Sequence, residues 1–313
     1  EAELRDFKEL FDSSLSSSNA LLDSVVSHIR QRNGKMMRPI LVLLVARLYG
    51  AVCPSTLHAA VSLELLHTAS LVHDDVVDES TERRGQLSVN AIFNNKVAVL
   101  TGDYLLATSL VHAELTNSHR IIQLVSTLGQ DLADGELLQL SNVSNHSFSE
   151  EVYFDVIRKK TAALFAACTK AAAFSVGVGE GEAELARLLG EYIGICFQIK
   201  DDIFDYYSSG EIGKPTGNDM SEGKLTLPAL HVLNTLGDEK MCQLAFRIKS
   251  LDATDAEISL FIDYVKKNGG IEYARQVMVD YRNKALDLLP STADTTIKDA
   301  LTAYIDYVIE REK

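Results

Sequence analysis

Long apolar stretches occur along the chain, such as residues 41–50 (LVLLVARLYG) and 162–174 (AALFAACTKAAAF). Stretches of this length and composition are typical of buried helices. Alternating β-branched runs bounded by turn pairs are scarce, so we expect no sheet. The pattern predicts an all-α protein with helices at 2–32, 36–50, 55–79, 87–117, 119–141, 149–176, 181–208, 224–235, 239–250, 255–268, 271–289 and 294–311.

Residues 208–223 (SSGEIGKPTGNDMSEG) form the most loop-like segment of the chain. Lys214 lies inside this glycine-rich stretch and Lys224 follows it directly. We favour a lid over an anionic ligand here, with a plain flexible connector as the alternative. No domain linker, internal repeat or low-complexity segment is visible elsewhere, so we expect one domain over residues 1–313.

The composition suits a large core and argues against nucleic-acid binding. Apolar residues make up 46% of the 313 residues, and the formal charge is 30 − 44 = −14. A chain this acidic has no basic stripe that could follow a phosphate backbone. Cys53, Cys168, Cys196 and Cys242 form no C-x-x-C pair, so we expect packed, reduced thiols in a cytoplasmic protein. No signal-peptide pattern and no apolar run of membrane-spanning length is visible in the sequence.

Two acidic runs of the form D-D-x-x-D, in LVHDDVVDES and QIKDDIFDYY, stand at the ends of predicted helices. On a helix each run directs carboxylates along one face, and such like charges destabilise the helix unless a cation neutralises them. Oxygen donors without a thiolate or imidazole set favour a hard cation, Mg²⁺ above all. A solvated helix end is the alternative for the first run, but Val76 and Val77 make its surroundings apolar. We leave the neighbouring His73 out of the metal set. The six carboxylates are Asp74, Asp75, Asp78, Asp201, Asp202 and Asp205.

Basic and amide residues gather near the same two runs. Arginine suits diphosphate oxygens because its guanidinium offers forked donors. We therefore expect two anionic headgroups, one bound through Mg²⁺ between the acidic runs and one bound by Lys35, Arg38 and Arg84. Glu136 and Gln139 are candidates to orient Lys160 or a water molecule. Four further lysines look like ordinary solvated charge: Lys240, Lys249, Lys266 and Lys267.

Five ordered motifs between residues 30 and 230 resemble the trans-isoprenyl diphosphate synthase family. They are G-K-x-x-R-P, D-D-x-x-D followed by R-R-G, a mid-chain K-T, Q-x-x-D-D-x-x-D, and G-K-P-x-G-x-D-x-x-E-G-K-x-T-L-P. Each motif alone is weak, but the ordered set is very specific. The resemblance is closer to the long-chain polyprenyl branch, including octaprenyl synthases, than to the farnesyl branch.

The resemblance implies an all-α isoprenoid-synthase bundle around a deep central cavity, with three Mg²⁺ ions per active site. It implies metal ligands Asp74, Asp78, Asp201 and Asp205, with Asp75 and Asp202 as ligands or outer partners. It assigns the allylic diphosphate to Arg83, Lys160, Lys214 and Lys224. It assigns isopentenyl diphosphate to Lys35, Arg38, His67 and Arg84. Thr161 and Gln198 would steady the developing allylic cation. From the residues alone, His67 is more readily a core residue.

Product length should depend on the side chains just before the first acidic run. A helix rises about 1.5 Å per residue, so Ala69 and Ser70 lie roughly 6–8 Å below Asp74. The resemblance implies that bulky aromatics at these positions stop the chain in short-chain relatives. Both residues are small here, so we expect a product of about C35–C45, octaprenyl diphosphate being the best single choice. We place the tunnel floor among Leu105, Leu106, Val125 and Leu128.

The predicted reaction is Mg²⁺-dependent, sequential head-to-tail condensation of isopentenyl diphosphate onto an allylic diphosphate such as farnesyl diphosphate. The family implies that the released diphosphate takes up the proton. We expect a homodimer packed through the apolar segment 88–117, a quinone side chain as the use of the product, and delivery of that product at a membrane surface.

Several alternatives stay open at this stage. A shorter-chain farnesyl or geranylgeranyl synthase shares every motif. A class I terpene cyclase shares the metal sites but needs no second diphosphate pocket. An inactive partner subunit usually loses acidic residues, and both runs here are complete. A Ca²⁺-binding helical protein would need the spaced loop ligands of an EF-hand, which are missing, and a phosphohydrolase built on His73 and Asp74 lacks further histidines.

Overall fold

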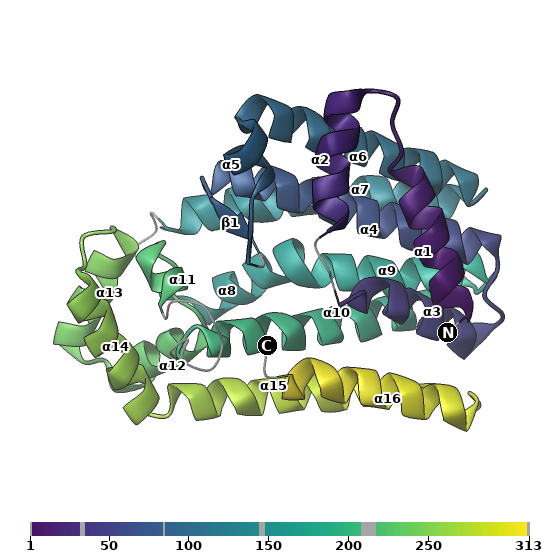
Figure 1. The fold of residues 1–313 in the computed structure, drawn as a ribbon. Helices are drawn as coiled ribbons and strands as arrows, with labels where there is room; N and C mark the ends of the chain where they lie inside the picture. The colour runs from purple at the N-terminus through teal and green to yellow at the C-terminus, as the bar shows by residue number, and fades with distance from the viewer. Residues whose placement is uncertain (1, 32–34, 84, 144–147, 208–216, 312–313) are drawn as a thin grey trace. The chain divides into compact units, whose positions relative to one another are not determined.

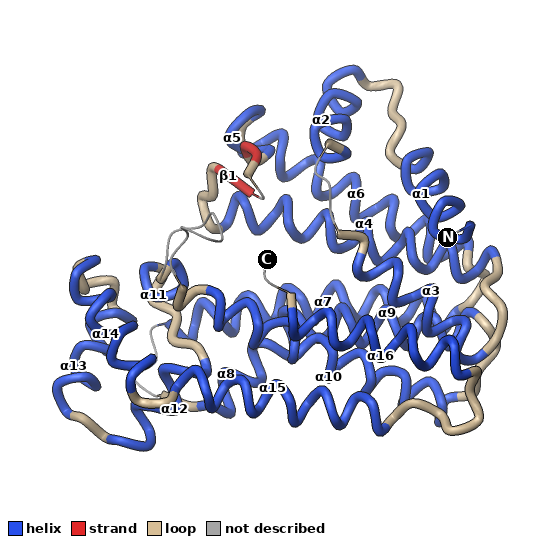
Figure 2. The backbone as a smooth tube through the Cα atoms, turned by 60° about the horizontal axis from the view of Figure 1, so that its bottom comes forward, coloured by secondary structure: helices blue, strands red, loops and turns tan. Residues whose placement is uncertain are grey.

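The computed structural model describes residues 2–31, 35–83, 85–143, 148–207 and 217–311. These residues are helical almost throughout, and the strands among them form one short hairpin (Figure 1 and Figure 2). The predicted all-α fold class is therefore confirmed.

Contacts along the chain define two compact units. The first unit comprises Glu1–Gln130, Leu164–Gly190 and Pro290–Leu301, and the second comprises Asp131–Ala163, Glu191–Leu289 and Thr302–Lys313. Helices α7 (His119–Val143), α10 (Glu180–Phe204) and α16 (Thr295–Glu310) contribute residues to both units. A single domain over residues 1–313 stays a prediction.

The first unit is built around α4 (Pro54–Val77), most of whose buried residues are apolar. Helix α6 lies along α4 (Figure 1). Ser62 Oγ of α4 donates to the carbonyl of Ser109 on α6 at 2.8 Å. A Cβ on Gly102 of α6 would stand only 2.2 Å from His73 Nε2, so glycine lets the two helices approach. The unit also contains α1 (Ala2–Ser14), α2 (Ala20–Arg30), α3 (Met37–Tyr49), α4 (Pro54–Val77), β1 (Glu82–Arg83), β2 (Gln86–Leu87), α5 (Val89–Phe93), α6 (Asn95–Leu115) and nearly all of α9 (Ala163–Ser175).

The second unit contains a π-helical turn, Arg158–Ala162, directly after α8. Helix α7 packs closely against this turn, because a Cβ on Gly135 would lie 3.0 Å from the backbone nitrogen of Lys160. Turns of this type are rare and often mark functional positions. The remaining elements are α8 (Glu150–Ile157), α11 (Asn218–Ser221), α12 (Leu227–Leu236), α13 (Glu239–Lys249), α14 (Asp255–Lys267) and α15 (Gly270–Asp287).

Two predicted helices are interrupted in the structure, so their predicted extents are wrong. The predicted helix 2–32 stops after Ser14, and α2 begins after Asn19, whose side chain accepts from the backbone nitrogens of Leu21 and Leu22. The predicted helix 87–117 breaks at Asn94, which has a φ of 95°. Such a backbone conformation cannot continue a helix.

The expectation of no sheet missed the hairpin formed by β1 and β2. Glu82 pairs with Leu87 and Arg83 pairs with Gln86 in antiparallel register. Gly85 takes a φ of 74°, which glycine adopts at little cost, so R-R-G was the local turn signal. The hairpin brings Arg83 back toward the end of α4, where it contacts Asp75.

Candidate active-site residues

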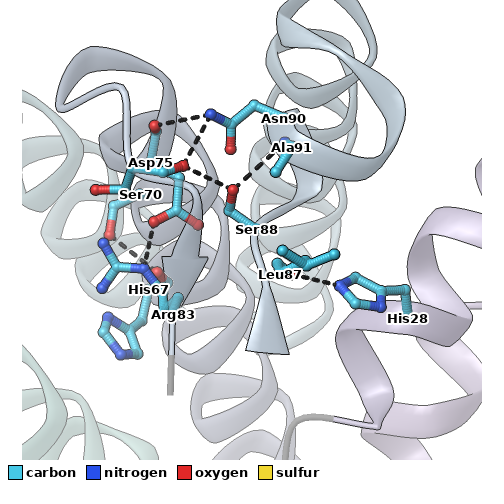
Figure 3. Close-up of polar contacts among 10 residues, drawn as sticks. His28, His67, Ser70, Asp75, Arg83, Leu87, Ser88, Asn90 and Ala91 are labelled. Atoms are coloured by element: carbon cyan, nitrogen blue, oxygen red, sulfur yellow. Dashed lines mark hydrogen bonds and ion pairs between the residues drawn. The ribbon is translucent and has the colours of Figure 1, made fainter. Parts of the chain in front are cut away.

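The first acidic motif lies in the last turn of α4, and its three carboxylates have different surroundings. Asp75 is buried with an exposed fraction of 0%, Asp74 is part-buried and Asp78 is exposed. Arg83 Nε donates to Asp75 Oδ1 at 2.5 Å. Figure 3 shows this ion pair, with Arg83 reaching back from the hairpin. Asp75 therefore has a cationic partner, while its two neighbours lie closer to solvent.

The chain after α4 is fastened to the same helix end by neutral hydrogen bonds. Asn90 Nδ2 donates to the carbonyls of Asp75 and Ser80, both at 3.1 Å. Ser88 Oγ donates to the carbonyl of Ser80 at 2.7 Å. These contacts fix the turn between α4 and the hairpin, and with it the position of Arg83. The diphosphate contact predicted for Arg83 stays a prediction.

The residues predicted to bind isopentenyl diphosphate fall in the first unit, as far as the structure describes them. Lys35 is exposed just before α3, and the Arg38 guanidinium carbon lies 5.0 Å from the centroid of the Phe165 ring. His67 is buried on α4, two turns before Asp74. Arg84 lies outside the described residues.

Ala69 and Ser70, the predicted chain-length residues, differ in exposure. Ala69 is 2% exposed, and Ser70 is part-buried. Ala69 follows Ser62 by seven residues and precedes His73 by four, and both of those side chains contact α6. Ala69 therefore faces the packing between α4 and α6. Four residues are predicted to form the floor of the product tunnel. Leu105, Val125 and Leu128 are buried, and Leu106 is part-buried.

The second acidic motif ends α10, and its middle aspartate is held by neutral donors. Asp202 is 3% exposed, and its two oxygens accept from Tyr153 Oη at 2.5 Å and from Gln198 Nε2 at 2.8 Å. Thr161 Oγ1 donates to Gln198 Oε1 at 2.7 Å. Thr161, Gln198 and Asp202 thus form a directed hydrogen-bond chain that begins in the π-helical turn.

Burial is the main reason why the pKa of Asp202 is raised to about 7. The negative charges of Asp201 and Asp205 raise this pKa further, while the bonds from Tyr153 and Gln198 lower it. Asp219 behaves similarly: burial and the charges of Asp202 and Asp205 raise its pKa well above the ordinary value, and Lys224 opposes the shift.

The outer aspartates of the second motif also have described partners. Asp205 accepts from the backbone nitrogens of Asn218 at 2.9 Å and Asp219 at 3.1 Å, which lie at the start of α11. Asp201 Oδ1 accepts from Arg311 at 2.7 Å. A loop was expected over 208–223; α11 shows that this is wrong for its last part. The other part, residues 208–216 with Lys214, lies outside the described residues.

Within the second unit, a cavity of about 180 Å³ joins several predicted residues. Lys160 reaches it from the π-helical turn and pairs with Glu136 Oε2 at 2.5 Å and Gln139 Oε1 at 3.2 Å. Of the two predicted roles for these residues, the structure shows contacts with Lys160, and their effect on its orientation stays a prediction. The described lining also includes Tyr153, Val156, Ile157, Thr161, Gln198, Asp202, Asp219, Lys224, Leu225, Thr226, Leu230 and Lys249.

Three lining residues were missed or misjudged from the sequence. Lys249 was expected to be solvated, which is wrong, because it is 8% exposed and burial lowers its pKa. Tyr153 belongs to none of the sequence motifs, and Asp219 stands in a motif that predicts no role for it. The G-x-D spacing was the available signal for Asp219, whereas nothing local marks Tyr153 or Lys249.

The donor set of both motifs fits magnesium better than a softer ion. All candidate ligands are carboxylate oxygens, as hard cations require. Among the described residues, no three His, Cys, Asp or Glu side chains come close enough together to bind an ion by themselves. Mg²⁺ is commonly bound by one or two carboxylates plus substrate phosphates, and this pattern suits the acidic motifs.

Two further sequence expectations concern the cysteines and the membrane. All four cysteines are free thiols, and burial raises the pKa of Cys168 and Cys196 to about 12. None of the described helices combines the length and apolar character needed to cross a membrane.

Comparison with known proteins decides the family. The model of the polyprenyl synthetase family matches residues 19–265. The chain belongs to this family. The sequence resemblance is thereby confirmed, and the chain is a prenyltransferase of the trans-prenyl diphosphate synthase type.

Relatives within the polyprenyl synthetase family differ in the product that their names state. Octaprenyl diphosphate synthase of Escherichia coli (strain K12) is 32% identical over 96% of this chain and 93% of its own length. The structure of geranylgeranyl pyrophosphate synthase from Bacteroides thetaiotaomicron is 68% identical, covering 99% of this chain and 96% of its own, with a TM-score of 0.87. The structure of a decaprenyl diphosphate synthase from Rhodobacter capsulatus is 35% identical in sequence and has a TM-score of 0.92. The match covers 100% of this chain and 97% of that chain.

Proposed function

We propose that this polyprenyl synthetase makes a long-chain all-trans polyprenyl diphosphate of about C35–C45, octaprenyl diphosphate being the best single choice. It would add isopentenyl diphosphate units head to tail onto an allylic diphosphate such as farnesyl diphosphate. The observation that carries the chemistry is the cavity where Lys160, Thr161, Gln198, Asp202 and Lys224 meet. Cleavage of an allylic diphosphate requires groups of these kinds: cations, a polarised amide and a carboxylate.

The first step is cleavage of the allylic carbon–oxygen bond. Lys160 and Lys224 neutralise charge that develops on the leaving diphosphate, and Lys160 already contacts Glu136 and Gln139. Mg²⁺, held by the aspartates of each acidic motif, would supply Lewis-acid neutralisation of the same diphosphate. We assign Asp74, Asp78, Asp201 and Asp205 as ligands, with three ions as the family-based expectation.

The second step forms the new carbon–carbon bond. The oxygens of Thr161 and Gln198, positioned by their mutual hydrogen bond, stabilise the allylic cation. Apolar side chains such as Val156, Ile157 and Leu230 help to exclude water that would quench it. The double bond of isopentenyl diphosphate attacks the allylic cation and leaves a new carbocation. This carbocation loses a proton to the released diphosphate, which forms the double bond of the product. Lys35, Arg38, His67 and Arg84 are our candidates for the isopentenyl headgroup.

The small size of Ala69 and Ser70 supports a long product. A bulky side chain at either position would stand about one turn before Asp74 and limit the space for the growing chain. The name of the relative at 68% identity instead favours a C20 product. The incubation described below distinguishes a C35–C45 product from a C20 product.

A homodimer is supported by the outer face of α6. Leu100, Val111 and Leu115 are 69%, 56% and 42% exposed, and Val99 and Leu110 lie beside them. Exposed apolar side chains at both ends of one helix suit a protein interface. We also retain three predictions: use of the product as a quinone side chain, delivery of that product at a membrane surface, and a cytoplasmic location.

The test is an incubation with farnesyl diphosphate, radiolabelled isopentenyl diphosphate and Mg²⁺, followed by separation of the dephosphorylated products by length. We expect a ladder that ends near C40 and disappears with EDTA. A product ending at C20 would refute the long-chain proposal while retaining the chemistry. Release of a cyclic hydrocarbon without incorporation of label would favour a terpene cyclase.

A further inference from the structure

Arg311, just after α16, is a charged residue in an almost fully buried position. Its side chain is 6% exposed, which is rare for arginine unless the guanidinium is paired. The guanidinium carbon lies 3.9 Å from the centroid of the Phe197 ring. Nε donates to the carbonyl of Val308 at 3.2 Å, and NH2 donates to the carbonyl of Phe197 at 2.9 Å. The side chain is therefore fixed by stacking and by two backbone acceptors.

The same guanidinium contacts the second acidic motif. Arg311 NH2 donates to Asp201 Oδ1 at 2.7 Å, and Asp201 lies one helical turn after Phe197 on α10. The carboxylate is 44% exposed, whereas its partner is buried. A buried donor that is fixed from several sides sets the orientation of a more exposed carboxylate, rather than the reverse.

This contact matters because Asp201 is one of three like charges in one helical turn. Asp202 follows it directly and Asp205 lies one helical turn after it, so the three carboxylates repel one another. A guanidinium beside Asp201 offsets part of this repulsion. Outer partners of ligating carboxylates orient them, and loss of such a partner usually weakens metal binding by 10–100-fold.

We propose that Arg311 is a positioning residue for Asp201, and that it raises the affinity of the second acidic motif for Mg²⁺. This inference rests on the proposed function. Arg311 lies beyond the residues that match the family model, which end at residue 265. The motif residues found in the sequence end near residue 230, so Arg311 lies outside them as well.

The test is direct metal binding, measured by titrating Mn²⁺ in the presence of inorganic pyrophosphate and detecting free Mn²⁺ by electron paramagnetic resonance. We expect Arg311→Met to weaken binding about 10–100-fold. Arg311→Lys keeps the charge but loses the planar fork, so it should weaken binding less. Because it retains a cation in the same place, it also serves as the second variant if Arg311→Met folds poorly. In an Asp201→Asn background, Arg311→Met should have little further effect.

Arg282→Met is the matched control. Arg282 pairs with Asp306 at 2.6 Å and so ties α15 to α16, but it contacts no motif aspartate. We expect wild-type Mn²⁺ affinity for this variant. Equal losses in both variants would show that docking of α16, and not the contact with Asp201, is what matters.

Unchanged or tighter binding in Arg311→Met would overturn the inference outright. Failure of the proposed function would be seen separately, as no incorporation of labelled isopentenyl diphosphate by the wild-type protein. A wild-type protein that incorporates label, together with an Arg311→Met variant that binds Mn²⁺ normally, would refute only the role of Arg311.

Discussion

The two acidic motifs share the letters D-D-x-x-D, yet the structure holds their middle aspartates in opposite ways. Asp75 pairs with the guanidinium of Arg83, whereas Asp202 accepts hydrogen bonds from the phenol of Tyr153 and the amide of Gln198. A cationic partner compensates a buried carboxylate charge directly. Neutral donors compensate it only in part, which is why burial still raises the pKa of Asp202 to about 7.

The outer aspartates differ as well. Asp78 is exposed at the end of α4, while Asp205 caps the start of α11 and Asp201 contacts Arg311. The second motif is therefore built into its surroundings through several hydrogen bonds. A repeated sequence motif therefore supplies the same carboxylates twice, while their charge balance depends on partners elsewhere in the chain.

The largest expected effect concerns stability and pH in the metal-free protein. A carboxyl whose pKa is about 7 when folded and 3.8 when unfolded binds more protons in the folded state between those values, so stability falls as pH rises from about 4 to 7. The cost above pH 7 is about 4 kcal/mol for a shift of this size. Asp202→Asn should therefore stabilise the protein at pH 8 by up to that amount and change little at pH 5, as measured by urea unfolding with EDTA present.

Asp75→Asn is the matched variant in the other motif. It leaves Arg83 without its charged partner, so we expect a loss of about 1–3 kcal/mol. If Asp202→Asn gave no gain at pH 8, or if both variants shifted stability in the same direction, the contrast between the two motifs would be wrong.

The next effect concerns catalysis and tests whether both motifs serve the reaction. Asp78→Asn and Asp205→Asn should each lower kcat/KM for isopentenyl diphosphate by at least about 100-fold, because each removes a carboxylate that we assign to Mg²⁺. Only Asp205→Asn should also cost stability, about 1 kcal/mol, because an amide has one acceptor oxygen, whereas both carboxylate oxygens of Asp205 accept from backbone nitrogens of α11. Full activity in either variant would contradict the assignment of that aspartate as a metal ligand.

The smallest expected effect concerns the product and leaves the rate of the first condensation largely intact. Ser70→Tyr and Ala69→Tyr should both shorten the product to C15–C20, resolved by chromatography of the labelled products. Ala69→Tyr should also destabilise the protein, because Ala69 is 2% exposed and faces α6. Long products from Ser70→Tyr would show that the tunnel does not pass this face of α4.

Much of the fold followed from the sequence, because apolar spacing over long segments determines helices. The breaks at Asn19 and Asn94 were missed although each has a local physical cause, a side-chain cap and a positive φ. The hairpin was missed because two residues per strand give no periodicity to detect.

The motif residues were visible in the sequence, but their surroundings were not. Tyr153 lies 49 residues before Asp202 and Arg311 lies 110 residues after Asp201, so no local pattern joins these pairs. Lys249 is a typical helix-end lysine by sequence, and only packing shows that it lines the cavity. Burial and charge partners of this kind depend on tertiary structure and cannot be derived from spacing.

The central claim is that both acidic motifs bind the metal for one prenyl-transfer reaction. The most direct measurement is the number of Mn²⁺ ions bound per chain in the presence of inorganic pyrophosphate, for the wild type and for the double variants Asp74→Asn/Asp78→Asn and Asp201→Asn/Asp205→Asn. We predict fewer bound ions in each double variant than in the wild type. A double variant that binds as many ions as the wild type would contradict the claim for the motif that it lacks.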